Sequence, residues 1–154
     1  MFKRNVILFI LSETSENQWQ LFGVTCKKVM IFRFARHTNN LAGLIDFYVD
    51  ILNFEVLGKF ENHGSYDGVF LGKKNQNWHL EFTTSSEKAH HIFDDDDILV
   101  FYPETMSMYH QIISNIERKN VKTTIPRNPY WKTNGIQIQD SDGYNIIISK
   151  QKVT

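Results

Sequence analysis

Four polar residues occupy alternate positions in two short segments that are typical of β-strands. Arg33 and His37 flank Ala35 in the first segment, and His79 and Glu81 lie two positions apart in the second. Because successive side chains of a strand point to opposite faces, each pair shares one face of its sheet. A guanidinium donates hydrogen bonds to anions and carbonyls, whereas an imidazole or a carboxylate accepts protons. These residue types suit a site that anchors a small polar molecule.

Composition places these residues in one neutral domain. The chain has 154 residues, of which 42% are hydrophobic and 14% aromatic, so it can bury a sizeable core. Its 17 basic and 17 acidic side chains cancel, which argues against nucleic-acid binding through phosphates. The single cysteine, Cys26, excludes an intramolecular disulfide and a cysteine-based zinc site, and it fits a reducing cytoplasm best. No segment approaches the roughly 18 consecutive apolar residues of a membrane span.

The elements that position the polar residues occur twice along the chain. Each half shows the order strand, helix, strand, strand, strand, because one stretch of helical apolar spacing is surrounded by β-branched and aromatic runs. The first half has predicted strands at 29–37, 54–60, 66–71 and 78–83 and a helix at 41–52. The second half has predicted strands at 98–102, 121–125, 135–139 and 144–149 and a helix at 106–119. Offsets of 65 and 66 residues superimpose the helices and the last strands, which indicates an internal duplication.

Two segments lie outside this repeat. Residues 1–28 form an N-terminal extension, in which the apolar run from Val6 to Leu11 is too short for a signal peptide. We expect an edge strand or a loose extension there, or a natural start at Met30. The connector at 84–97 ends in four aspartates, Asp94 to Asp97. A solvated linker is expected, because a calcium loop alternates its ligands and needs a glycine turn.

Motifs in both halves resemble the vicinal oxygen chelate superfamily, which includes glyoxalase, bleomycin-resistance and extradiol-dioxygenase proteins. The segment from Phe47 to Phe54 resembles the family's F-Y-x-x-x-L-G-F, and the segment from Asp140 to Tyr144 resembles its D-P-D-G-N ending. A narrower likeness is to an uncharacterised bacterial branch, and it rests on residues 33–39, 66–72 and 128–131. The resemblance covers residues 29–150.

The resemblance implies an α+β fold of two βαβββ modules that form a curled sheet around a cleft. Module one spans 29–83, the connector 84–97 and module two 98–150. Relatives often assemble as dimers, so a homodimer is expected. Two modules can form the cleft within one chain or across a dimer, and both arrangements remain open.

Enzymes of this superfamily usually hold a divalent metal (Zn, Ni, Fe or Mn) with four side chains, two from each module. The matching positions in this chain are Arg33, Glu81, Ile98 and Ile147, and a slip of one residue would give Asp97 in the third position. Arginine and isoleucine have no lone pair to offer, so Glu81 is the only matched ligand. We therefore predict no cofactor and keep a metal site as the alternative.

The family geometry would place Arg33 beside Glu81, where relatives hold the metal. A bidentate guanidinium–carboxylate pair can form there. Such a pair either neutralises an abandoned site or leaves Arg33 to anchor an anionic or carbonyl-bearing ligand, with Glu81 or His79 as proton acceptor. Further residues are expected to complete the ligand pocket, with the last two in a proline-flanked loop that acts as a lid: His37, Tyr66, Tyr102, Tyr130 and Trp131.

The predicted function is therefore metal-free binding of a small molecule by a cytoplasmic homodimer that binds neither nucleic acid nor membrane. The first alternative is a metal-dependent glyoxalase-like lyase, isomerase or dioxygenase. The second is a non-catalytic scaffold with a filled cleft.

Overall fold

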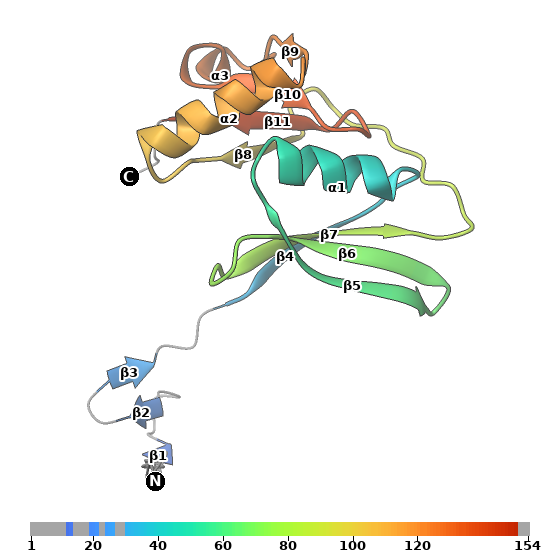
Figure 1. Cartoon of the computed structure of the whole chain (residues 1–154), viewed down its shortest axis with the longest axis vertical. Helices are drawn as coiled ribbons and strands as arrows, with labels where there is room; N and C mark the ends of the chain where they lie inside the picture. The colour runs from blue at the N-terminus through green and yellow to red at the C-terminus, as the bar shows by residue number, and fades with distance from the viewer. Residues whose placement is uncertain (1–11, 14–18, 22–23, 27–29, 151–154) are drawn as a thin grey trace, which may run out of the picture. The chain divides into compact units, whose positions relative to one another are not determined.

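The computed structural model of the chain describes residues 12–13, 19–21, 24–26 and 30–150 (Figure 1). Contacts divide it into two units, Met1–Phe32 and Arg33–Thr154. In the first unit, β1 (Ser12–Glu13), β2 (Trp19–Leu21) and β3 (Val24–Cys26) pair as an antiparallel sheet. The apolar run from Val6 to Leu11 lies outside the described residues. No helix in the described part of the chain is long and apolar enough to cross a membrane.

The first module has the predicted order of elements. It comprises β4 (Phe32–His37), α1 (Leu41–Asp50), β5 (Glu55–His63), β6 (Tyr66–Gly72) and β7 (Trp78–Thr84). The strands form one sheet in the order β4-β7-β6-β5. The side chain of Asn40 caps α1 by accepting a hydrogen bond from the Gly43 N–H at 2.9 Å. Asn53, with φ of 55°, ends the helical region and starts the return into β5.

The second module repeats this order with one addition. It comprises β8 (Ile98–Phe101), α2 (Met106–Arg118), β9 (Thr123–Thr124), α3 (Pro129–Asn134), β10 (Ile136–Gln139) and β11 (Asn145–Ile148). The strands form a second sheet in the order β8-β11-β10-β9, with β8 parallel to β11. A turn at Asp142 and Gly143 joins β10 to β11, and Gly143 adopts a φ of 85° there.

The proline-flanked segment that contains Tyr130 and Trp131 was predicted as a loop, and this prediction was wrong. The segment forms the short helix α3. The Asn128 side chain caps it by accepting from the Tyr130 N–H at 2.9 Å, and Pro129 occupies its first turn. Proline suits that position because the first turn of a helix leaves its N–H groups without intrahelical partners.

One face of each sheet turns toward a common hydrophobic core. Leu44 and Tyr48 of α1 are fully buried there. Phe101 of β8 contacts Phe54 and Trp78 of the first module, with ring centroids 5.3 and 5.9 Å apart, so side chains of both modules meet in this core. The strand residues of the core are Val69, Leu71, Leu80 and Phe82 from the first sheet and Ile138, Ile146 and Ile148 from the second.

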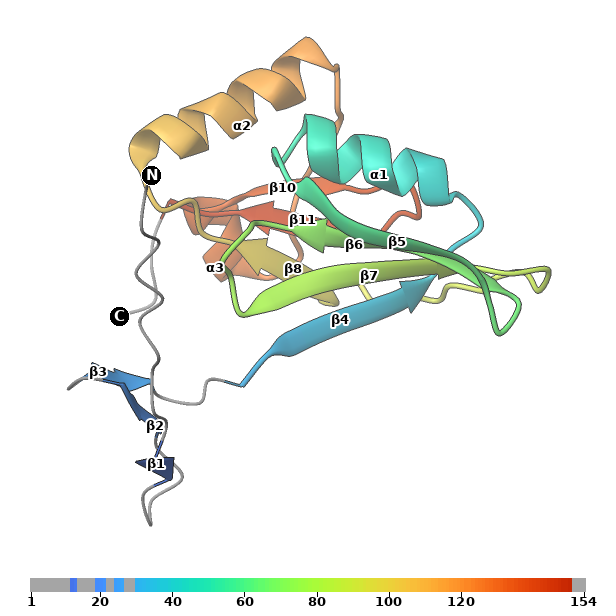
Figure 2. The ribbon, with the colours of Figure 1, turned by 60° about the horizontal axis from the view of Figure 1, so that its bottom comes forward.

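The residues that alternate with the core lie on the other face of each sheet. In the first sheet this outer face carries Arg33 and Glu81, and α1 lies along the opposite face (Figures 1 and 2). Within residues 33–150, no helix lies along the outer face of this sheet (Figure 2). In the second sheet the outer face carries Gln137 and Ile147, and α3 lies beside it, with Trp131 and Ile147 both close to Gly135.

A buried ionic cluster joins the two modules. Arg36 of β4 donates through Nη2 to the carboxylate of Asp140, at 2.5 Å, and it lies 3.2 Å from Asp142. Tyr48 donates its hydroxyl to the same Asp140 oxygen at 3.1 Å, and Thr38 donates to Asp142 at 2.8 Å. The three charged side chains are at most 7% exposed. The Asp-Ser-Asp-Gly turn of the second module is therefore tied to β4 and α1 of the first.

Candidate functional site

The outer face of the first sheet brings Arg33, His79 and Glu81 together. Arg33 Nη1 donates to Glu81 Oε2 at 2.9 Å, and Arg33 Nε donates to His79 Nε2 at 3.0 Å. The predicted contact between Arg33 and Glu81 is confirmed, but the predicted bidentate geometry is wrong. The guanidinium divides its hydrogen bonds because His79 and Glu81 lie at adjacent positions on the same face of β7.

This arrangement fixes the hydrogen-bonding role of His79. An arginine N–H can only donate, so His79 Nε2 must accept, and the ring proton resides on Nδ1. The His79 Nε2 lone pair, a predicted proton acceptor, is therefore already engaged by Arg33. Within residues 30–150 no donor bonds Glu81 Oε1, so this oxygen has room for a further hydrogen bond.

An aromatic surface supports the guanidinium. Arg33 Cζ lies 5.1 Å from the centroid of the Phe70 ring, and Phe70 contacts the rings of His79 and Phe60. Phe60 in turn covers Gly68, where a Cβ would lie only 2.2 Å from its Cζ atom. A row of rings thus runs from β5 to β7 and ends at a cation. The Arg33 side chain nevertheless remains 52% exposed.

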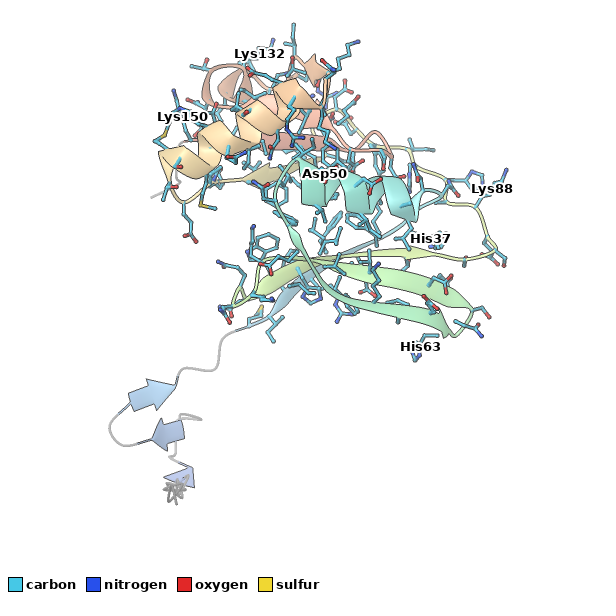
Figure 3. The ribbon with its side chains drawn as sticks, in the orientation of Figure 1. His37, Asp50, His63, Lys88, Lys132 and Lys150 are labelled. Atoms are coloured by element: carbon cyan, nitrogen blue, oxygen red, sulfur yellow. The ribbon has the colours of Figure 1, made fainter. Side chains whose placement is uncertain are left out.

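His37 and Tyr66 lie farther along the same face. Their rings meet edge to face at 5.5 Å. His37 Nδ1 is 3.2 Å from the Thr83 hydroxyl, and Nε2 is 3.1 Å from the carbonyl oxygen of Glu87 in the connector. Both ring nitrogens of His37 therefore have protein partners, whereas Tyr66 is 43% exposed. Figure 3 shows His37 at the end of β4 that leads into α1.

The remaining predicted residues belong to the outer side of the second module. Tyr130 and Trp131 of α3 contact each other with ring centroids 4.8 Å apart. Partial burial raises the pKa of Tyr102, and the neighbouring Tyr130 adds to the shift, so Tyr102 lies near this pair. The predicted residues thus form two groups on separate faces of the chain.

The aspartates of the connector have a structural partner. Arg127 pairs with Asp94 and, at 2.7 Å, with Asp96, all on the surface. The exposed, solvated character predicted for this run is confirmed, whereas its pairing with Arg127 was not predicted. These pairs attach the connector to the segment that leads into α3.

The residues at the four metal positions of the superfamily do not fit a divalent cation. Arg33 occupies the first position and its guanidinium already engages Glu81, the second. Ile147, in the fourth position, is fully buried and packs near Gly135. Among the described residues, no group of three or more His, Cys, Asp or Glu side chains is arranged to hold a metal ion.

Two βαβββ modules, each with its helix on the core face of its sheet, define a vicinal oxygen chelate protein. Residues 32–83 match the YycE-like N-terminal domain, and residues 96–150 match the YycE-like C-terminal domain. The chain is 34% identical over 124 residues to the uncharacterized protein YycE of Bacillus subtilis, covering 78% of this chain and 87% of that protein. The chain therefore belongs to the YycE-like family.

Solved structures agree with this assignment. The crystal structure of Bacillus subtilis YycE, a protein of unknown function proposed to be a glyoxalase or fosfomycin-resistance protein, superimposes with a TM-score of 0.73 at 32% identity, covering 80% of this chain and 91% of that one. Two further solved structures, of lower sequence identity, show only that the fold is shared. The trypanothione-dependent glyoxalase I of Leishmania major gives a TM-score of 0.61 at 20% identity, covering 80% of this chain and 86% of that one. TnmS3, an antibiotic-binding protein of Streptomyces, gives a TM-score of 0.57 at 14% identity, covering 80% of this chain and 97% of that one.

Proposed function

We propose that this chain binds a small anionic or carbonyl-bearing molecule at Arg33 without using a metal. The observation that carries the proposal is a guanidinium positioned by His79 and Glu81 over Phe70 yet 52% exposed. An ion pair exposed to this extent contributes only about 0–1 kcal/mol to stability. A role in ligand binding accounts for the preorganised side chain better than a role in folding does.

Each residue of the group has a part in this proposal. Arg33 anchors the ligand's anionic or carbonyl oxygen through the N–H groups that its partners leave available. His79 positions the guanidinium, and Phe70 provides an apolar surface for the ligand's body. If the bound molecule reacts, Glu81 accepts the proton through Oε1. Binding by this fold has a counterpart in the antibiotic-binding protein TnmS3.

Replacing Arg33 tests the proposal directly. A thermal-shift screen of small carboxylates, phosphonates and ketones should first find a compound that raises the Tm, since any ligand of the folded state stabilises it. We expect Arg33→Gln to weaken the Kd of that compound about tenfold or more, measured by calorimetry. Arg118→Gln, an exposed arginine of α2, is the matched control and should leave the Kd unchanged.

Three outcomes contradict this reading in different ways. An unchanged Kd in Arg33→Gln would show that Arg33 is not the anchor. One tightly bound Zn, Ni, Fe or Mn per chain, found by elemental analysis after purification without chelators, would favour the metal-dependent glyoxalase-like enzyme. A screen in which no compound raises the Tm would favour the scaffold with a filled cleft.

The placement of the two groups supports a homodimer. The core face of each sheet turns toward the other module, so the outer face of the first sheet is available to a second copy of the chain. A partner's second module would bring its tyrosines and tryptophan over Arg33. Light scattering coupled to size exclusion should give twice the mass of one chain, and Tyr66→Asp on this face should shift the protein toward monomer. A monomeric wild-type protein at micromolar concentration would contradict the dimer.

A further inference from the structure

The Arg33 group has two hydrogen-bonding atoms of opposite kind that its own contacts leave free. Arg33 donates through Nε to His79 and through Nη1 to Glu81 Oε2, and its Nη2 has no partner within residues 30–150. In the same part of the chain no donor bonds Glu81 Oε1. Because Oε1 shares a carbon with the oxygen that Arg33 contacts, a free donor and a free acceptor lie on neighbouring groups.

Both free atoms are open to a ligand. The side chain of Arg33 is 52% exposed and that of Glu81 is 13% exposed. In the part of the chain that the structure describes, the buried side-chain atoms without a hydrogen bond belong to Arg36, Gln137 and Asp142. Glu81 Oε1 is not among these atoms, so it keeps contact with solvent.

The group carries no net charge. Glu81 compensates Arg33, and His79 adds no charge because its Nε2 accepts the Arg33 N–H. The other residues on this face of β6 and β7 are uncharged, namely Tyr66, Gly68, Phe70, Gly72 and Thr83. An anion bound at Arg33 would therefore meet the free carboxylate oxygen of Glu81. A neutral ligand that both accepts and donates suits the two free atoms better.

The aromatic surface formed by Phe60 and Phe70 lies beside the two free atoms. Phe60 covers Gly68, where a Cβ would collide with its ring, and Phe70 lies beside Gly58, where a Cβ would come within 3.1 Å of the Phe70 ring. The two ring centroids are 5.7 Å apart, and Arg33 Cζ lies 5.1 Å from that of Phe70. Both rings are only partly buried, so part of each remains available to a planar apolar body.

We propose that the Arg33 site selects a neutral aromatic amide. The amide oxygen accepts from Arg33 Nη2, the amide N–H donates to Glu81 Oε1, and the ring packs on the aromatic surface. The inference rests on the function proposed for Arg33 and deepens it, because it chooses a carbonyl-bearing ligand over an anionic one.

Benzamide, acetophenone, benzoate and acetamide form a matched set of probes. Acetophenone has a methyl group in place of the NH₂ of benzamide, benzoate has a charged oxygen there, and acetamide lacks the ring. In NMR titrations of the full-length, isotope-labelled protein, benzamide should shift the amide signals of residues 33, 70 and 79–81 saturably. Acetophenone and benzoate should each bind at least about fivefold more weakly, because neither donates to Glu81 Oε1. Acetamide should bind at least about tenfold more weakly, because it buries no ring.

Glu81→Gln tests the charge argument with a side chain of almost the same shape. Removing the carboxylate leaves Arg33 uncompensated, so this variant should bind benzoate at least about fivefold more tightly than benzamide. Glu117→Gln, at an exposed position of α2, is the matched control and should keep the wild-type order of the four probes.

The wild-type titrations decide the inference even if a variant fails to fold. It is overturned if benzamide gives no saturable shifts on this face, if acetophenone or acetamide binds as tightly as benzamide, or if Glu81→Gln keeps the wild-type order. Should benzoate bind most tightly and lose its affinity in Arg33→Gln, this inference fails while the function proposed for Arg33 stands. Benzamide binding that is unchanged in Arg33→Gln would contradict both.

Discussion

Replacing Arg36 by methionine should lower the free energy of unfolding by about 3–5 kcal/mol, since removing one partner of a buried ion pair leaves uncompensated charge in the interior. The loss is large here because the guanidinium serves two carboxylates, Asp140 and Asp142, that are at most 5% exposed. It also lies 4.9–5.7 Å from the rings of Tyr144, Phe82 and Phe93 and stabilises them through cation–π contact.

Urea unfolding followed by circular dichroism measures this effect. Arg118→Met removes an exposed arginine from α2 and should change stability by no more than about 0.5 kcal/mol. Adding Asp142→Asn to Arg36→Met should recover part of the loss, because the amide oxygen still accepts from Thr38 while one unpaired charge disappears. A loss below about 1 kcal/mol in Arg36→Met would mean that the cluster does not hold the modules together.

The stability of the protein should fall steeply in alkaline solution because of Tyr48. Burial raises the pKa of Tyr48 well above its usual value, and the negative charge of Asp140 raises it further. The folded protein therefore keeps this proton after the unfolded chain has lost it. The stabilisation is fully present below about pH 10 and is lost as the pH rises through the folded-state pKa.

Comparing wild type with Tyr48→Phe isolates this contribution. One extra proton bound by the folded state makes the free energy of unfolding fall by about 1.4 kcal/mol per pH unit. Above about pH 10 the free energy of unfolding of Tyr48→Phe should therefore fall less steeply than that of wild type, by up to this amount. Below that pH the variant should be less stable by about 1 kcal/mol, because it loses the hydrogen bond to Asp140. Urea unfolding at a series of pH values gives both quantities. Parallel pH profiles for the two proteins would show that Tyr48 ionises alike in both states.

Local chemistry explains which predictions succeeded at the candidate site. Strand alternation placed Arg33 on one face with His37 and Glu81 on one face with His79, and the resemblance to the superfamily implied that Arg33 and Glu81 lie together. The contact was therefore predictable, whereas its geometry was not. Arg33 donates to His79 through Nε and to Glu81 through Nη1, and this division depends on side-chain conformations that residue spacing does not reveal.

Other functional features had weaker signals in the sequence. Arg36 alternates with Phe34 on the strand face that becomes buried, so a charge in a core position was visible but had no recognisable partner. The partners, Asp140 and Asp142, lie more than 100 residues away in a turn whose hydrophilic composition is typical of solvent exposure.

The sequence by itself determined the two-module architecture, because the periodicity of apolar residues that marks helices and strands acts between near neighbours. It also determined that Arg33 stands where relatives place a metal ligand, because a residue's type is fixed before folding. Only the tertiary structure decided that the predicted residues divide between two faces, that α3 replaces a loop, and that Arg36 lies in the core. Those outcomes depend on which sheet faces pack together, and packing joins residues that are distant along the chain.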